Sequence, residues 1–133
     1  MKNFAYIFLI LLLFQSCSTN VSVNKDESSL TFEKNEEEEY DIIVFDPQYD
    51  VYLKTIARPQ SYFSEEYYKM KNQQYVTSWN LRHSQPLQYN PDLYMVRIDY
   101  EPNTYYGLNL EYKLYNFFKF IEWKYKVNLN FAG

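Results

Sequence analysis

The composition of this chain changes abruptly at Tyr40, and that change limits what the chain can fold into. Residues 18–39 are polar, contain no glycine or proline, and end in an acidic block from Glu36 to Glu39. Every tyrosine except Tyr6 lies at or after Tyr40, together with both tryptophans. A polar, acidic segment cannot bury enough apolar surface to offset the entropy that ordering costs. The sequence therefore predicts a flexible acidic tether followed by one folded domain.

The first sixteen residues have the layout of a secretory signal peptide. Lys2 supplies a positive charge, an unbroken apolar run extends from Phe4 to Phe14, and the small residue Ser16 precedes the only cysteine, Cys17. The run is shorter than the roughly 20 apolar residues of a membrane-spanning helix. The segment LFQSC that ends at Cys17 resembles the lipobox of bacterial lipoproteins. The resemblance implies cleavage after Ser16 and acylation of Cys17.

Acylation of Cys17 would give the protein a membrane partner and a place in the bacterial cell envelope. Two or three acyl chains anchor a protein stably, whereas one chain binds reversibly. Ser18, directly after the cysteine, resembles a sorting signal for the outer membrane. The alternative is a secreted protein cut near Ser16, with Cys17 as a free thiol. The predicted organisation is a signal peptide at 1–16, a lipidated N-terminus and flexible acidic tether at 17–39, and an aromatic-rich globular domain at 40–133.

The hydrophobic pattern of residues 40–133 predicts an α+β fold. Tyr40 to Asp46 is a β-branched and apolar run that Pro47 ends, which is typical of a buried strand. Ser64 can cap a helix that runs to Arg82 and His83, since Glu65 and Glu66 follow it at the positive end of the helix dipole. A second long helix is predicted from Asn109 to Tyr125. We expect these two main helices to pack on a small sheet.

Three shorter elements are also predicted. Asp50 can cap a short helix from Val51 to Ala57, although Val51, Leu53 and Thr55 alternate in a way that leaves a strand open. Val96 to Tyr100 alternates as a half-exposed strand. Val127 to Phe131 alternates strictly and is expected to form a third short strand.

Aromatic side chains are expected to supply most of the core. Each buries a large area, which compensates for scarce aliphatic residues in a small domain, and this favours a core role over a ligand-binding platform. On the second long helix Lys119 and Glu122 lie away from the apolar stripe, so both should tolerate alanine. The residues expected on the inner faces of the two helices are Tyr68, Tyr75, Val76 and Trp79, then Leu110, Leu114, Phe117, Phe118, Ile121 and Tyr125, with Phe120 and Trp123 forming a second apolar edge.

Several classes of chemistry are excluded by composition. With Gly107 and Gly133 as the only glycines, the chain has no phosphate-binding glycine loop. One histidine and one cysteine cannot build a Cys/His zinc site or a Cys/His nucleophile pair. The formal net charge of −4 offers no basic stripe for nucleic acid. We therefore expect no cofactor, no metal and no nucleic-acid partner.

The remaining candidates for chemistry are carboxylates. Asp46 and Asp50 follow the end of the first predicted strand, and two nearby acids could act as general acid and base on a glycan. Both also have ordinary structural explanations as turn and cap residues. Asp99 to Asn103 begins like a calcium loop but lacks the glycine and the final glutamate that such a loop needs. His83 is expected to act at the end of a helix rather than in catalysis.

The folded region resembles a family of small bacterial lipoproteins described only as a domain of unknown function. The resemblance covers about Tyr40 to Leu129, and it implies a lipoprotein address without an activity, a cofactor or a catalytic residue. The segments that carry it are Asp41 to Asp50, Ala57 to Pro59, Tyr67-Tyr68, Tyr75-Val76, Trp79 to Arg82, Ile98 to Tyr100 and Tyr112 to Phe120.

Two functional hypotheses follow from the sequence. The favoured one is a membrane-anchored envelope lipoprotein whose folded domain is a non-enzymatic interaction or binding module for an envelope protein or glycan. The alternative is a small envelope hydrolase that acts on glycan through Asp46 and Asp50. A hydrolase needs a cleft in which carboxylates converge, whereas a binding module needs a contiguous exposed aromatic patch.

Overall fold

The computed structural model describes residues 30–34 and 39–130. The predicted signal peptide, Cys17 and most of the predicted tether lie outside these residues. The described elements are strands β1 (Leu30–Lys34) and β2 (Tyr40–Val44), helix α2 (Pro47–Thr55), a 3₁₀ turn (Gln60–Tyr62), helix α3 (Glu65–His83) and helix α4 (Leu108–Tyr125).

Strands β1 and β2 form an antiparallel hairpin. Leu30 pairs with Val44 and Phe32 with Ile42, so apolar residues of both strands share the inner face, and Leu30 and Ile42 are buried. The prediction of a flexible tether at 17–39 is wrong for residues 30–34, which form β1. Its apolar residues alternate with polar ones over only a few positions, and a strand this short is stable only when a partner such as β2 satisfies its backbone.

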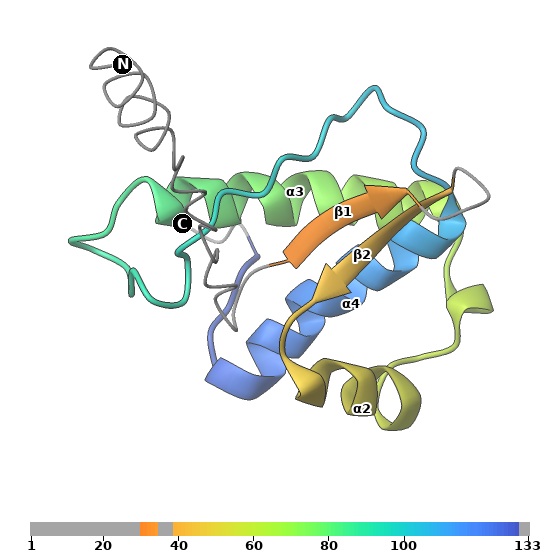
Figure 1. Cartoon of the computed structure of the whole chain (residues 1–133), viewed down its shortest axis with the longest axis horizontal. Coiled ribbons are helices and arrows are strands. Elements are labelled where there is room, and N and C mark those ends of the chain that lie inside the picture. Colours follow the sequence, from red (N-terminus) through yellow and green to blue (C-terminus); the bar gives the residue numbers. More distant parts are fainter. Residues whose placement is uncertain (1–29, 35–38, 131–133) are drawn as a thin grey trace, which may run out of the picture.

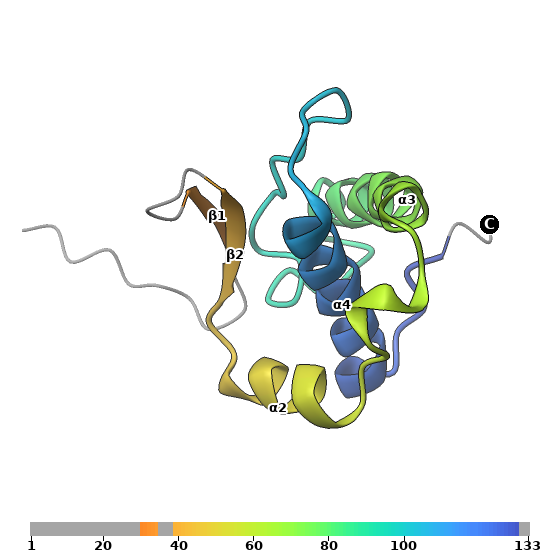
Figure 2. The same ribbon diagram turned by 90° about the vertical axis from the view of Figure 1, so that its right-hand side faces the viewer.

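Helix α4 occupies the centre of the domain. Figures 1 and 2 show the hairpin on one side of α4, α3 on the opposite side and α2 across one end. The domain is therefore α+β, as predicted, with three helices and a two-stranded antiparallel sheet among the described residues. The sheet packs on α4 through β2, and α3 packs on the far side of α4.

The inner faces of the two long helices are those that the sequence predicts. Ser64 caps α3 by accepting a hydrogen bond from the Tyr67 N–H at 3.2 Å. Tyr125 departs from the prediction because it is 41% exposed at the end of α4. Of the predicted second apolar edge, Phe120 is buried against Tyr49 and Tyr52 of α2, whereas Trp123 contacts Tyr52 but is 43% exposed. The predicted inner residues that are buried are Tyr68, Tyr75, Val76 and Trp79 in α3, and Leu110, Leu114, Phe117, Phe118 and Ile121 in α4.

Helix α2 begins earlier than predicted and is capped by Asp46 rather than Asp50. The Asp46 carboxylate accepts a hydrogen bond from the Gln48 N–H at 3.0 Å, and Pro47 occupies the first turn. A proline pushes the preceding residue into extended backbone, which is the conformation of an N-cap, and its missing N–H costs nothing at this position. The same proline therefore ends the β2 region and starts the helix. The strand alternative for this segment is excluded.

The predicted strand Val96–Tyr100 does not form. Its backbone is instead bonded to side chains of α3: the Asn80 amide donates to the Ile98 carbonyl and accepts from the Ile98 N–H, both at 2.9 Å. The Trp79 indole donates to the Val96 carbonyl at 2.8 Å. These side chains hydrogen-bond the backbone N–H and C=O groups that a neighbouring strand would otherwise bond. The segment therefore lies outside the sheet.

The predicted strand Val127–Phe131 is also absent from the described residues, which end at Asn130. Lys126 adopts a left-handed conformation at the end of α4 (φ 56°), and Leu129 turns back into the core. The Leu129 N–H donates to a Glu122 carboxylate oxygen at 2.8 Å. Glu122 is therefore not the free surface residue that the helical pattern indicated.

Candidate functional site

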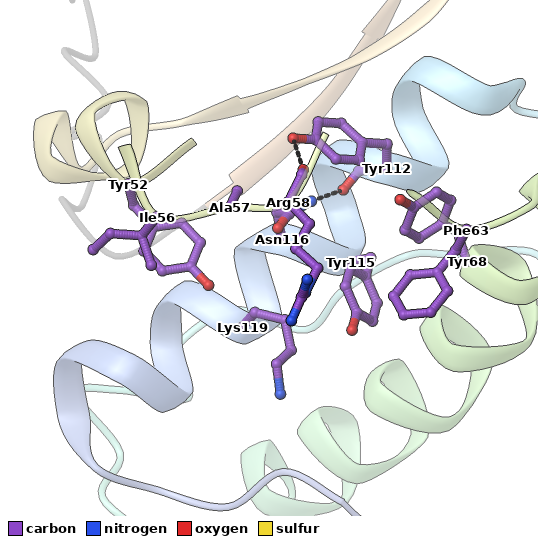
Figure 3. Close-up of a pocket in the computed structure, with 10 residues that line it drawn as sticks. All are labelled: Tyr52, Ile56, Ala57, Arg58, Phe63, Tyr68, Tyr112, Tyr115, Asn116 and Lys119. Atoms are coloured by element: carbon purple, nitrogen blue, oxygen red, sulfur yellow. Dashed lines mark hydrogen bonds between the residues drawn. The ribbon is translucent and has the colours of Figure 1, made fainter. Parts of the chain in front are cut away.

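A cavity of about 210 Å³ lies where α2, the 3₁₀ turn, α3 and α4 meet. Figure 3 shows Tyr52 and Ile56 on one side of it, Phe63 and Tyr68 on the other, and residues of α4 between them. We name it the aromatic pocket. Its ten lining residues are Tyr52, Ile56, Ala57, Arg58, Phe63, Tyr68, Tyr112, Tyr115, Asn116 and Lys119.

The local sequence explains why these residues meet. Tyr112, Tyr115, Asn116 and Lys119 are separated by steps of three, one and three, so they share one face of α4. On the opposite wall the chain leaves α2 at Ile56 and reaches α3 through Pro59, which prevents the helix from continuing. The connection therefore crosses this face of α4 without filling it.

Aromatic rings form the wall on the α3 side. The Phe63 ring stacks on Tyr67 with centroids 4.0 Å apart. Tyr68 meets Tyr115 at 5.2 Å and Tyr112 at 5.7 Å. Rings in such edge and stacked arrangements stabilise one another beyond their area burial. The wall thus presents ring faces and edges to the cavity.

The phenols of the pocket remain protonated at neutral pH. Burial raises the pKa of Tyr52, Tyr68 and Tyr112, and it raises the pKa of Tyr115 to about 12. Tyr112 donates its O–H to the Arg58 carbonyl at 2.8 Å, and Tyr68 donates to the Gln60 carbonyl at 3.1 Å. The Tyr112 bond ties the connection between α2 and α3 to α4, and the Tyr68 bond ties it to α3.

The two cations of the pocket are in different environments. Lys119 Nζ lies 2.6 Å from a Glu122 carboxylate oxygen. Burial acts to lower the pKa of Lys119, but the hydrogen bond to Glu122 and the neighbouring phenols raise it above its ordinary value overall, so the ammonium stays charged. The Arg58 guanidinium lies 4.3 Å from the centre of the exposed Tyr62 ring.

Asp46 and Asp50 do not form a catalytic pair in a cleft. One Asp46 oxygen caps α2, and the other forms an ion pair with Lys124 of α4. Asp50 is exposed in the first turn of α2. Neither lines the aromatic pocket. Asp46 is therefore a helix cap and an ion-pair partner, whereas Asp50 does not have the cap role that the sequence predicted for it.

The other sequence candidates also occupy structural or exposed positions. His83 Nδ1 lies 2.7 Å from the Tyr94 carbonyl and ties the end of α3 to the following loop. The Asp99 side chain is exposed and lies 3.5 Å from Arg97. Over residues 30–34 and 39–130, no group of three or more His, Cys, Asp or Glu side chains is arranged to hold a metal ion. In the same residues no helix combines the length and apolar character that crossing a membrane requires.

Sequence reasoning missed a buried polar network between α3 and α4. Glu111 is 1% exposed, Asn72 is 0% exposed, and the Asn72 amide donates to both the Glu111 carbonyl at 2.9 Å and its carboxylate at 2.7 Å. The Tyr100 hydroxyl donates to the same carboxylate at 2.9 Å. The only signal in the sequence was Glu111 next to the apolar stripe of α4, which reads equally well as a solvated helix position.

Sequence reasoning also missed the aromatic pocket. Its residues come from segments far apart in the chain, between Tyr52 and Lys119, and no short motif joins them. Most of the aromatic excess is core, as predicted: only Tyr62, Tyr105, Tyr125 and Trp123 are exposed among the described tyrosines and tryptophans. None of these four exposed side chains lines the aromatic pocket, whose own aromatic rings are buried or half-buried.

The model of a protein family described as "Family of unknown function (DUF6146)" matches residues 5–132. No curated protein and no solved structure matches the chain. Because the family match spans almost the whole sequence, the chain belongs to this family, which confirms the resemblance to a domain of unknown function.

Proposed function

We propose that this member of a family of unknown function is an envelope lipoprotein, anchored through Cys17, whose folded domain is a non-enzymatic binding module. The observation that carries the binding role is the aromatic pocket, an accessible cavity with ring walls and protonated hydroxyls. Concave sites of this composition, with a few fixed polar groups, are the usual form of a small binding site.

The anchor is supported by the N-terminal sequence. Lys2, the apolar run from Phe4 to Phe14 and the LFQSC segment together fit a lipoprotein signal. Ser18 supports an outer-membrane address. The acidic residues that follow would keep the chain from adhering to an anionic membrane surface, and so leave the domain free to meet a partner.

The chemistry of the aromatic pocket favours binding over hydrolysis. A glycan hydrolase of the usual kind places two carboxyl groups on either side of the bond that it cleaves. None of the ten pocket residues is an aspartate or glutamate. Asp46 is bonded on both oxygens within the fold, as described above. The hydrolase hypothesis therefore has no paired acids at the cavity.

Replacement of Cys17 tests the anchor. Expressed in a bacterium that processes lipoproteins, the wild-type protein is expected in the membrane fraction, with a mass that exceeds that of the chain from Cys17 onward by the acyl groups. Cys17→Ala should lose that added mass and leave the membrane fraction, because no thiol remains to be acylated. Intact mass spectrometry and fractionation measure both. An unchanged mass offset and distribution in the variant would exclude lipidation.

Filling the aromatic pocket tests the binding role. Ala57 lines the cavity, so Ala57→Phe should occupy it, whereas Thr77→Phe adds the same ring to an exposed position of α3 away from it. With a photocrosslinking residue at the exposed rim position Ile56, the full chain in its own cells should form an adduct with an envelope protein or glycan. Ala57→Phe should abolish that adduct and Thr77→Phe should preserve it. Equal adduct formation by both variants contradicts the proposed role of the pocket, and the absence of an adduct in the wild type contradicts a macromolecular partner.

A further inference from the structure

The aromatic pocket contains an uncompensated positive charge. One of the two cations that line the pocket, Lys119, is already paired with Glu122. Arg58 has no carboxylate within ion-pair distance in the part of the chain that the structure describes, and the pocket lining itself contains no acid. In Figure 3 the Arg58 side chain extends toward α4, beside Tyr115 and Lys119. A guanidinium of this kind suits the planar, two-oxygen geometry of a carboxylate.

The pocket also offers unused hydrogen-bonding groups. The hydroxyls of Tyr68 and Tyr112 are bonded to backbone carbonyls, but those of Tyr52 and Tyr115 make no hydrogen bond within the described residues. Asn116 uses its N–H to bond the Tyr112 carbonyl at 2.9 Å, and its side-chain oxygen has no described partner. A ligand that lies here without polar groups would leave these atoms unpaired, which is costly once water is displaced.

The dimensions indicate a single ring. The cavity of about 210 Å³ is smaller than the roughly 300–1,000 Å³ of pockets for drug-sized ligands. One wall is made of ring faces and edges from Phe63, Tyr68 and Tyr115. A saturated ring packs its C–H groups on such a wall while its hydroxyls point toward the polar atoms.

We propose that the aromatic pocket binds an acidic sugar, with its carboxylate on Arg58, its ring against the aromatic wall and its hydroxyls on Tyr52, Tyr115 and Asn116. The assignment rests on the proposed function, since it names the ligand class of that same site. A flat aromatic carboxylate fits the charge equally well but leaves the phenol and amide groups unpaired. The acidic sugar is either a free monosaccharide or one residue of an envelope glycan.

Two sugars that differ mainly in one carboxylate provide the direct test. Full-length protein, purified in detergent, is titrated with D-glucuronate, D-glucose and phenylacetate by ligand-observed NMR and calorimetry. Glucuronate should bind at least tenfold more tightly than glucose, and more tightly than phenylacetate. Equal affinity for glucuronate and glucose removes the role of the carboxylate. Tighter binding of phenylacetate overturns the assignment to a sugar.

A matched pair of variants locates the charge. Arg58→Gln should weaken glucuronate binding at least tenfold and leave the weak binding of glucose unchanged, because the carboxylate of glucuronate loses its charged partner and glucose has no carboxylate. The control is Lys54→Gln, which removes an exposed cation in the last turn of α2 that does not line the pocket. It should bind glucuronate as the wild type does. Thermal melts confirm that both variants are folded. Full glucuronate affinity in folded Arg58→Gln overturns the proposal.

The source of the sugar and the proposed function are tested separately. An acidic oligosaccharide of glucuronate units that binds more tightly than the monosaccharide indicates a glycan polymer, and equal affinity per residue indicates a free sugar. If Ala57→Phe abolishes the crosslinked adduct but glucuronate does not bind, the binding module stands and the acidic-sugar assignment fails. If no adduct forms but glucuronate binds, the assignment stands without a macromolecular partner.

Discussion

Phe117→Ala is expected to lower the free energy of unfolding by about 3 to 5 kcal/mol, the range for removing a large buried aromatic side chain. Phe117 is 1% exposed and its ring lies 5.5 Å from Trp79 of α3 and 5.4 Å from Phe118. The loss combines the transfer of the ring with the cavity left between two helices that cannot collapse freely. Urea unfolding of the chain without its first 17 residues measures it.

The control for this prediction must be chosen from the structure rather than from the helical pattern. Lys119 and Glu122 were expected to tolerate alanine, but Glu122 binds both Lys119 and the Leu129 N–H. Gln74, exposed on α3, is the better control, and Gln74→Ala should change stability by no more than about 0.5 kcal/mol. If Phe117→Ala and Gln74→Ala unfold alike, α4 is not the central helix.

Asn72→Ala is expected to cost about 3 kcal/mol, since each buried polar group left without its partner costs roughly 1 to 3 kcal/mol and more when it is charged. The change removes the donor of two hydrogen bonds at once, one to the Glu111 carbonyl and one to its carboxylate. Both acceptors lie between α3 and α4, where water has no access. Urea unfolding against the Gln74→Ala control measures the loss, and a cost below about 1 kcal/mol would show that the network adds little.

The cost of Asn72→Ala should also depend on pH. Burial raises the pKa of Glu111, while the hydrogen bonds from Asn72 and Tyr100 and the charge of Lys69 lower it and Glu65 raises it. A carboxyl whose pKa is higher in the folded than in the unfolded state holds its proton more tightly when folded. Its contribution to stability is therefore complete below the unfolded pKa and is lost as pH rises through the folded pKa.

Without Asn72 the pKa of Glu111 rises further, so the variant should lose more stability at pH 8 than at pH 5, relative to the wild type. Glu111→Gln is the control for this dependence. The glutamine side chain keeps an acceptor for the Asn72 amide and a hydrogen-bonding partner for the Tyr100 hydroxyl, but it cannot ionise. The decrease in the free energy of unfolding as pH rises above the ordinary carboxyl pKa should therefore be smaller in this variant. An identical pH profile in Glu111→Gln and the wild type would show that Glu111 does not titrate differently on folding.

The two long helices could be read from the sequence because helical structure is local. Helix formation is decided by features that lie within a few turns of one another. In α3 these are the Ser64 cap and the acids after it, and in α4 the apolar stripe. A short stretch of sequence therefore contains the interactions that decide whether a helix forms. The same holds for β2, whose apolar run is bounded by Pro47. The fold class followed from these elements.

Other features were decided by contacts between distant residues. Leu30 to Lys34 forms a strand because β2 pairs with it. The alternating Val96–Tyr100 segment does not, because side chains of Asn80 and Trp79 hydrogen-bond its backbone. Pairing of this kind depends on which groups tertiary packing brings together, and strand patterns are correspondingly less reliable than helical ones.

The candidate site is formed entirely by tertiary packing and could not be predicted from the sequence. The sequence drew attention to Asp46 and Asp50 because they are close in the chain, but packing uses Asp46 as a helix cap and an ion-pair partner of Lys124. The aromatic pocket instead has Arg58 and Tyr115 in its lining, at the place where α2, α3 and α4 pack together. The sequence alone determined the helices and their inner faces, since those depend on neighbouring residues, and it is the basis of the proposed envelope address. Only the tertiary structure decided that Arg58 lies at the aromatic pocket without a carboxylate partner among the described residues, since this depends on every element that packs around the pocket.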